Sequence, residues 1–290
     1  MSPTFTDRIL VTLQRALPAR SIGRFIYYLT RSELRWVKNA LITGFSWLYA
    51  VNTAEAEKPV PDGYRSFNEF FTRSLKTGAR AMDTGTDTFI CPADGTIAQV
   101  GKAIDGQLLQ AKGIEFSASE LLADSHLAGE LSDCHFATIY LAPYNYHRLH
   151  MPLDGTLEQT IFVPGLLYSV NARTAATVPG LYAVNERLVC QFNSQRGRFA
   201  MVLVGAMNVA SISTAWRGEI TPLRNGIVQT QFFSGTDRPK LSQGDYMGHF
   251  NMGSTVVMLG PQDLISWATE LVPGKIVQVG QQLGNMTESI

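Results

Sequence analysis

Residues 187–205, RLVCQFNSQRGRFAMVLVG, contain two short runs that are mostly apolar, RLVCQF and FAMVLVG, separated by polar residues and Gly197. Runs of this length between polar and Gly-containing segments predict β-strands. The same pattern recurs from Phe89 onward, in the segments TIAQV, LLQA, FATIYLA, GTLEQTIFV, YAVN, NVASIST, GEITPL and VVML. We expect one helix among them, from Ser117 to Ala123. Strands at this density predict a β-rich barrel or sandwich.

The N-terminal part of the chain follows a helical pattern instead. Apolar residues within residues 5–51 recur at three- and four-residue spacing, which predicts amphipathic helices. We expect Ser21 to cap one helix and Thr30 to begin a capping box for the next. A further short helix is expected from Phe67 to Leu75, capped by Ser66. Amphipathic helices that precede a β-rich body make the predicted fold class α+β.

The positive charge of the chain is concentrated at its N-terminal end. Lys and Arg number 24 in total and so do Asp and Glu, which leaves no basic excess for binding nucleic acid. Residues 1–50 nevertheless carry seven basic and two acidic groups, a net charge of +5, together with several Trp and Tyr. These helices therefore either pack as a layer on the rest of the protein or lie in the headgroup layer of a membrane. Because residues 53–63 have the composition of a linker, we expect a helical region over 1–52 and a β-rich domain over 53–290.

Cysteine usage and hydropathy limit where the chain acts. Cys91, Cys134 and Cys190 are an odd number without a C-x-x-C pair, which favours a reducing compartment over a disulfide framework or a structural zinc site. We expect no signal peptide. The longest uncharged N-terminal run, residues 39–54, has 16 residues, fewer than the ~20 apolar residues that a membrane-spanning helix needs. We therefore expect no transmembrane helix.

Three segments contain residue types that carry chemistry. Asp94 lies in Pro92-Ala-Asp-Gly, which by itself is typical of a turn. His147 and His150 lie three residues apart in YNYHRLHMP, residues 144–152. Ser254 lies in Gly-Ser-Thr before a β-branched run, which by itself predicts the start of a strand. Asp94, His147 and His150 could also bind zinc with one position open for water, so a zinc-dependent hydrolase is an alternative.

Together and in this order, the three segments resemble the phosphatidylserine decarboxylases, specifically the bacterial membrane-associated type I enzymes. The resemblance covers nearly the whole chain. It also includes FNEFFTR at 67–73, LKTGAR at 75–80, APYNYHRLHMP at 142–152, PG at 164–165, NER at 185–187 and VGAMNV at 204–209. Cys91, Tyr246 and Met252 depart from the commoner family pattern, and we expect these departures to affect local packing only.

The resemblance implies that the chain is an inactive precursor that cuts itself between Gly253 and Ser254. The products would be a β chain, residues 1–253, and an α chain, residues 254–290. The Ser254 hydroxyl would attack the Gly253 carbonyl, with His150 as the base and Asp94 orienting His150. Glycine at position 253 would leave its carbonyl open and tolerate unusual backbone torsions. Elimination and loss of ammonia would then convert Ser254 into a pyruvoyl group.

The same resemblance implies a decarboxylase with the pyruvoyl group as its covalent cofactor and without a metal. The amine of phosphatidylserine would form a Schiff base at the former Ser254, which takes up the electrons released when CO2 leaves. His147 would donate the proton that completes phosphatidylethanolamine.

The implied partners are phosphatidylserine in the membrane and the two chains themselves. The α and β chains would stay together as a heterodimer, which could pair again as a homodimer. The protein would act as a peripheral protein on the cytoplasmic face of the cell membrane. A lipid-binding protein without catalytic activity is a third interpretation, and only the decarboxylase predicts a chain cut near residue 253.

Overall fold

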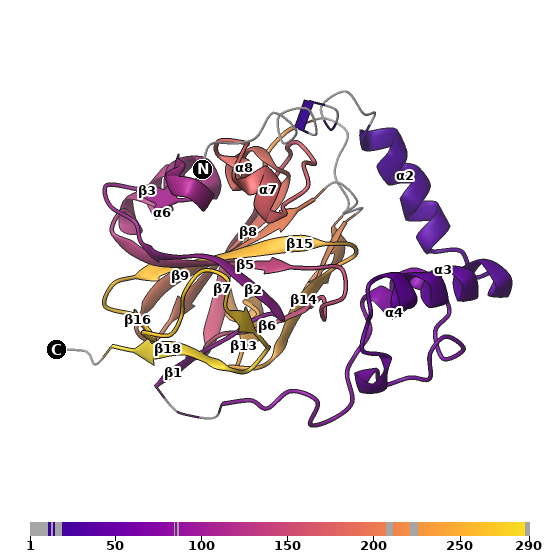
Figure 1. Ribbon diagram of the computed structural model, residues 1–290. Helices are drawn as coiled ribbons and strands as arrows, with labels where there is room; N and C mark the ends of the chain where they lie inside the picture. The colour runs from indigo at the N-terminus through magenta and orange to yellow at the C-terminus, as the bar shows by residue number, and fades with distance from the viewer. Residues whose placement is uncertain are drawn as a thin grey trace.

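The structure, a computed structural model, describes residues 11, 12, 14, 19–83, 85, 87–206, 211–220 and 226–287. Helices at the N-terminal end of this part lie to one side of a β-rich body (Figure 1). The predicted α+β class, with N-terminal helices before a β-rich body, is confirmed.

The largest sheet among the described residues has nine strands. Eight follow the order β12-β7-β8-β9-β15-β5-β2-β17, and β13 pairs with β7. They are β2 (Gly95–Lys102), β5 (Cys134–Leu141), β7 (Gly155–Val163), β8 (Arg187–Ser194), β9 (Gly197–Gly205), β12 (Gln229–Phe232), β13 (Lys240–Leu241), β15 (Ser254–Pro261) and β17 (Ile276–Val277). Because β12 and β17 stand at opposite ends of this order, the sheet is open rather than a closed barrel.

Three smaller antiparallel sheets complete the described body. A four-stranded sheet has the order β11-β10-β14-β6, a three-stranded sheet the order β1-β18-β16, and β3 pairs with β4. Their bounds are β1 (Thr88–Ile90), β3 (Gln107–Leu109), β4 (Glu115–Ser117), β6 (Arg148–His150), β10 (Ile212–Thr214), β11 (Gly218–Ile220), β14 (Tyr246–Phe250), β16 (Ile265–Trp267) and β18 (Gln282–Met286).

The central strands of the large sheet form the main hydrophobic core. Nearly all side chains of β5, β9 and β15 are buried, those on both faces included. Burial on both faces explains why FAMVLVG is continuously apolar rather than alternating. The two runs RLVCQF and FAMVLVG pair with each other as β8 and β9. Gly197 begins β9 at φ +126°, a backbone conformation that only glycine adopts without strain.

The N-terminal helices pack partly against the body. They are α2 (Ala19–Thr30), α3 (Arg35–Leu48) and α4 (Phe67–Phe71), with a 3₁₀ turn at Thr53–Glu55. A second hydrophobic cluster joins α3 to α4 and to the segment between them. Its buried members are Ile42, Val51, Ala56, Tyr64, Phe67, Phe70 and Phe71. Because this cluster includes side chains from both sides of residue 52, the helices are tied to the residues that follow them, and the boundary at 52/53 stays a prediction.

Of the three predicted helix caps, one is confirmed and two are wrong. The Ser66 hydroxyl accepts a hydrogen bond from the Glu69 amide at 3.2 Å, as expected at the start of α4. Ser21 lies inside α2 instead of capping it. The Thr30 hydroxyl donates back to the Ile26 and Tyr27 carbonyls at the end of α2, so it is not free to cap α3. The part of the predicted helical region before Ala19 lies outside the described residues, apart from residues 11, 12 and 14.

Short helices cover one side of the large sheet (Figure 1). They are α5 (Ala118–Leu122), α6 (Ser125–Glu130), α7 (Ala172–Ala175) and α8 (Leu181–Val184), and further 3₁₀ turns lie at Ala111–Gly113 and Gly235–Asp237. The helix predicted from Ser117 to Ala123 is confirmed as α5, whereas α6 and α7 were not expected. The prediction of a strand at YAVN is wrong, because this segment forms α8. There Tyr182 is buried edge-on against Phe116, and this tertiary contact outweighs the local strand preference.

Candidate active site

The fold brings the three predicted segments together. The His150 amide donates to the Pro92 carbonyl at 2.9 Å, which joins the second segment to the first. The Phe250 amide, four residues before Ser254, donates to the His147 carbonyl at 3.2 Å, and Ser254 pairs with Leu141, three residues before the second segment; these contacts place the third segment beside the second. Segments up to 160 residues apart in sequence therefore meet where the four-stranded and nine-stranded sheets adjoin.

Ser254 is the first residue of β15, between the ends of β5 and β9. It pairs with Leu141 on one side and with Gly205 on the other, and its side chain is fully buried. Its Oγ has no hydrogen-bond partner in the described part of the chain. A buried hydroxyl without a partner is costly. Thr138 and Thr255 share this feature, and in Ser254 it leaves Oγ without a competing hydrogen bond among the described residues.

Gly253 lies on the short connection from β14 to β15, residues 251–253. Its φ is outside the left-handed region, and a Cβ added there would meet no atom within 4 Å. The resting backbone of the uncut chain therefore does not require glycine at this position, and the expectation that the attack needs unusual torsions there stays a prediction. Any need for glycine arises when the carbonyl is attacked, and not in the resting backbone.

His150 lies at the end of β6 with both ring nitrogens in contact. Nδ1 lies 2.8 Å from the Gly244 carbonyl, which can only accept, so Nδ1 carries the proton. Nε2 is then the acceptor nitrogen, and the Tyr146 hydroxyl donates to it at 3.1 Å. Burial lowers the pKa of His150, which favours the neutral ring that a base requires.

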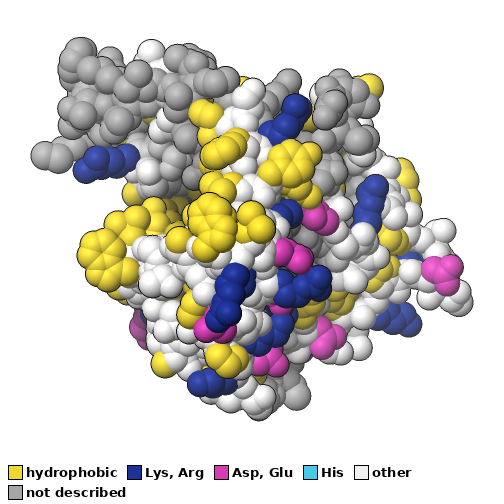
Figure 2. Space-filling view, turned by 90° about the vertical axis from the view of Figure 1, so that its right-hand side faces the viewer, with side chains coloured by type: hydrophobic (Ala, Val, Ile, Leu, Met, Phe, Trp, Pro, Cys, Tyr) yellow, Lys and Arg dark blue, Asp and Glu magenta, His cyan; other side chains and the backbone are white. Residues whose placement is uncertain are grey.

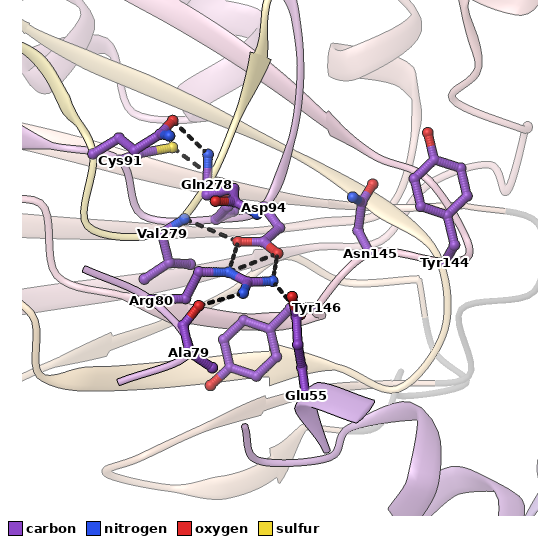
Figure 3. Close-up of polar contacts among 12 residues, drawn as sticks. Glu55, Ala79, Arg80, Cys91, Asp94, Tyr144, Asn145, Tyr146, Gln278 and Val279 are labelled. Carbon is purple, nitrogen blue, oxygen red and sulfur yellow. Dashed lines mark hydrogen bonds and ion pairs between the residues drawn. The ribbon is translucent and has the colours of Figure 1, made fainter. Parts of the chain in front are cut away.

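Asp94 is held in the turn before β2 by a buried arginine. Arg80 donates to both carboxylate oxygens from Nε, at 3.0 and 3.1 Å, and from Nη2 to Oδ2 at 2.5 Å (Figure 3). The Val279 amide donates to Oδ1 at 2.9 Å, and Arg80 also bonds Glu55 at 3.1 Å. Despite burial, hydrogen bonds to Asp94 and Glu55 raise the pKa of Arg80. Asp94 therefore forms an ion pair with Arg80 in addition to lying in a turn.

The next residue, Gly95, allows Asp94 to lie this deep. A side chain at position 95 would overlap the Tyr140 carbonyl oxygen of β5. The close approach of the two strands thus requires glycine and leaves Asp94 only 3% exposed.

Asp94 and His150 are near each other without a direct hydrogen bond. The negative charge of Asp94 raises the pKa of His150 and so opposes the effect of burial. The hydrogen bonds that orient the His150 ring in the uncut chain come from Gly244 and Tyr146. The role of Asp94 as the group that orients His150 stays a prediction.

His147 occupies a different environment from His150. Its ring is fully buried and stacks on Phe71, with centroids 4.1 Å apart. Burial, aided by the nearby charge of Arg73, lowers the pKa of His147 to about 3. Nε2 lies 3.4 Å from the Pro143 carbonyl, and Nδ1 has no partner among the described residues. His147 is therefore neutral, with its N–H on Nε2 directed at the Pro143 carbonyl and with Nδ1 as an acceptor that is unpartnered in the described part of the chain.

The alternative of a zinc site gains no support from this geometry. Where the structure describes the chain, no three His, Cys, Asp or Glu side chains are grouped so that they could hold a metal ion. Asp94 is bound to Arg80, and His147 stacks on a phenylalanine.

Comparison with known proteins decides the family. Residues 67–285 match the family model described as phosphatidylserine decarboxylase, and residues 9–50 match a second model described as PSD. The chain is 45% identical to the phosphatidylserine decarboxylase proenzyme of Ectopseudomonas mendocina, over 96% of this chain and 98% of that protein. Identity is 44% to the proenzyme of Stutzerimonas stutzeri and 43% to that of Alcanivorax borkumensis, each over at least 94% of both chains. The chain belongs to the phosphatidylserine decarboxylase family.

One departure from the commoner pattern of phosphatidylserine decarboxylases contacts the site. The Tyr246 ring packs edge-on against His150, with centroids 6.4 Å apart, and its hydroxyl bonds His249 Nδ1. The Arg148 guanidinium lies 5.2 Å from the centre of the same ring. The expectation that Tyr246 affects local packing only is therefore too narrow, because it forms one wall of the His150 environment.

Other residues of the site were not singled out from the sequence. Arg80 and Tyr146 lie within segments that resemble the family, but the sequence pattern indicates no role for them, and Asn251 lies just before the Gly-Ser-Thr segment. A basic residue near a buried Asp-Gly turn could have suggested Arg80 as a partner, because a buried carboxylate needs one. Asn251 gave no signal, since its contacts are with residues distant in sequence.

Proposed function

We propose that this chain is a self-cleaving, pyruvoyl-dependent phosphatidylserine decarboxylase that forms phosphatidylethanolamine and CO2. Membership of the family supports the reaction, and the names of its relatives, which are proenzymes, support processing. The observation that carries the proposal is the buried, unpartnered hydroxyl of Ser254 at the first residue of β15.

In the proposed cleavage, Ser254 Oγ attacks the carbonyl carbon of Gly253. His150 Nε2 takes the hydroxyl proton, and the proton passes to the Ser254 nitrogen as the peptide C–N bond breaks. An ester then joins Gly253 to Ser254. Loss of the Ser254 α-proton releases the Gly253 carboxylate and leaves a dehydroalanine, which water converts to a pyruvoyl group and ammonia.

The pyruvoyl group would take the place of the Ser254 side chain, and the buried environment of that side chain suits it. When present, the pyruvoyl group supplies an electron sink for the carbon that loses CO2. We assign His147 as the proton donor. Its pKa of about 3 keeps the ring neutral in the uncut chain at physiological pH, so it acts as an acid only after it gains a proton in the processed site. Its stacking on Phe71 fixes the ring plane, so the donor has a defined direction.

The two chains should stay together after cleavage. Three strands of the proposed α chain pair with strands of the proposed β chain: β15 with β5 and β9, β17 with β2, and β18 with β1. Breaking one peptide bond leaves these pairings intact. We therefore expect the α and β chains to form a heterodimer that separates only in denaturant.

We also propose that α2 and α3 dock the protein on the membrane as a peripheral protein, at the cytoplasmic face. Figure 2 shows the side of the molecule that carries these helices, where hydrophobic side chains gather beside Lys and Arg. The exposed apolar side chains here, which we call the helical apolar surface, are Phe25, Tyr28, Leu34, Trp36, Trp47 and Leu48. Exposed aromatic side chains beside basic groups suit an interface with anionic lipid. Among the described residues, no helix has the length and apolar character needed to cross a membrane.

Intact-mass measurement of the purified chain tests the proposal. We expect a 37-residue fragment of about 4 kDa that carries a pyruvoyl N-terminus, and Ser254→Ala should give only full-length chain. Thr138→Val is a matched control, because Thr138 on β5 is also buried and its hydroxyl also lacks a partner. The control should cut normally. Cleavage of the Ser254→Ala chain at the same bond would contradict the proposal.

A further inference from the structure

Asn251, two residues before the proposed cleavage bond, is the centre of a buried polar network. Its side chain is almost fully buried. Nδ2 donates to Ser211 Oγ at 2.8 Å, to Ser213 Oγ at 3.1 Å and to the Ser211 carbonyl at 3.3 Å. Oδ1 accepts from Asn68 Nδ2 at 3.0 Å. Both ends of the amide are thus fixed, by β10 on one side and α4 on the other.

The backbone around Asn251 is fixed as well. The Asn251 amide donates to the Ser211 carbonyl at 3.1 Å, and the preceding Phe250 amide donates to the His147 carbonyl. The next residue, Met252, packs against both hydrophobic clusters. On the other side of the cleavage bond, Ser254 is held between β5 and β9. The bond therefore lies between two anchored ends, with Gly253 as the one residue between them that has space around it.

The network continues from Asn251 to the N-terminal helices. The Ser211 hydroxyl that receives the Asn251 amide itself donates to Glu219 on β11. Glu219 pairs with Arg31 at 2.6 Å, directly after α2. The Arg31 guanidinium lies 3.6 Å from the centre of the Tyr27 ring within α2.

We propose that Asn251 is a positioning residue for self-cleavage, which holds the Gly253 carbonyl in the path of the Ser254 hydroxyl. The inference rests on the proposed function, because it concerns the rate of the same cleavage. Orientation of two reacting groups contributes strongly to rate, and a misplacement of about 1 Å can cost roughly 10²-fold. An amide with donor and acceptor ends held from opposite sides restrains both the translation and the rotation of the segment that bears the carbonyl.

The experiment follows cleavage of freshly synthesised chain over time. We expect Asn251→Ala to slow formation of the 37-residue fragment by about 10²-fold. Asn68→Ala removes only the donor to Oδ1 and should slow it by a smaller factor. Gln110→Ala is the matched control, since Gln110 is also a fully buried amide, bonded to Ala175, Val178 and Leu181 on another side of the fold. If Gln110→Ala and Asn251→Ala lower the melting temperature by the same amount, the Gln110→Ala control should still cut at the wild-type rate.

Hydroxylamine identifies the step that Asn251 affects. It attacks the ester between Gly253 and Ser254, which leaves a hydroxamate on Gly253 and a free serine N-terminus. If Asn251 positions the carbonyl for attack, the ester forms slowly and hydroxylamine does not restore the rate of cutting. Full restoration by hydroxylamine, or cutting of Asn251→Ala at the rate of the Gln110→Ala control, would overturn the inference. If Asn251→Ala does not fold, the same two comparisons are made with Asn68→Ala. A wild-type chain that is never cut would instead refute the proposed function.

Discussion

Arg80 binds both carboxylate oxygens of Asp94 at 2.5–3.1 Å. Only 10% of the Arg80 side chain and 5% of the Asp94 side chain is exposed, so each charge compensates the other in a buried place. Burial lowers the pKa of His150, and the negative charge of Asp94 opposes part of that shift. Asp94 thus combines a structural partnership with its proposed role in cleavage, and substitutions have to separate the two.

Removing the Asp94 charge alone should damage both stability and cleavage. Asp94→Asn leaves Arg80 with Glu55 as its remaining carboxylate partner, so we expect a loss of about 3 kcal/mol in the free energy of unfolding. Arg80→Met combined with Asp94→Asn removes both charges and should recover much of that stability, while the chain still fails to cut. Urea unfolding is measured in a Ser254→Ala background, and cleavage with Ser254 present. A double variant that cuts at the normal rate would show that the Asp94 charge is unnecessary.

The two histidines should respond differently to substitution. His150→Ala removes the acceptor nitrogen next to Tyr146 and should accumulate uncut chain. His147→Ala should retain appreciable cleavage but lose roughly 10²–10⁴-fold in lipid turnover, the usual contribution of general acid–base assistance. A denaturing gel measures cleavage, and CO2 release from labelled phosphatidylserine, normalised to pyruvoyl formed, measures turnover. Reversed cleavage phenotypes would mean that the two roles are assigned the wrong way round.

The strands of the body could be predicted because local pattern and tertiary burial agree there. FAMVLVG is apolar on both faces and is buried on both faces in β9, and RLVCQF is buried on both faces in β8 although one face carries Arg187 and Gln191. The capping box at Thr30 could not be predicted reliably, since the hydroxyl has a competing acceptor in its own preceding turn. The strand prediction at YAVN is wrong for a different reason: the segment forms α8, where Tyr182 is buried edge-on against Phe116, a contact that the local sequence pattern does not encode.

The residues of the candidate site could be predicted from the sequence, but the contacts that hold them in place could not. The sequence indicates that Asp94, His147, His150 and Ser254 matter, because their chemistry fits cleavage. It does not indicate that Arg80 holds Asp94 or that Gly244 fixes the proton on His150 Nδ1. These contacts depend on how β2, β6 and β14 meet, which short-range spacing does not encode.

Buried neutral histidines should make the protein sensitive to acid. Burial is the main cause that lowers the pKa of His147 to about 3 and of His249 to about 4. In the unfolded chain both titrate near the ordinary value of about 6.5. Between these values the unfolded state binds more protons, so stability is complete above about pH 6.5 and falls as pH decreases.

His147→Phe tests this contribution, since a phenyl ring can stack on Phe71 and does not titrate. Between pH 6.5 and pH 5, His147 should lower the free energy of unfolding of the parent chain by about 2 kcal/mol. The His147→Phe chain should not show this loss. Both chains carry Ser254→Ala so that one uncut chain unfolds. His126→Gln is the control, because 79% of that side chain is exposed, and it should lose stability in acid as the parent does. Equal acid sensitivity of His147→Phe and its parent would contradict the prediction.

Exposed tryptophans on α3 should contribute directly to membrane binding. Trp36 is 75% exposed and Trp47 is 83% exposed, on the helical apolar surface. Burying such a side chain in the lipid interface is worth about 1.5 kcal/mol or more, so each change to Ala should weaken binding to anionic vesicles about 10-fold. Phe232→Ala is the matched control: it is also 75% exposed but lies on β12, at the edge of the large sheet. Vesicle sedimentation at low and high salt measures the affinity, and salt should weaken the binding of all variants because the basic charge is shared. Equal losses for Phe232→Ala and Trp47→Ala would show that any exposed apolar side chain contributes and that α3 has no special part in docking.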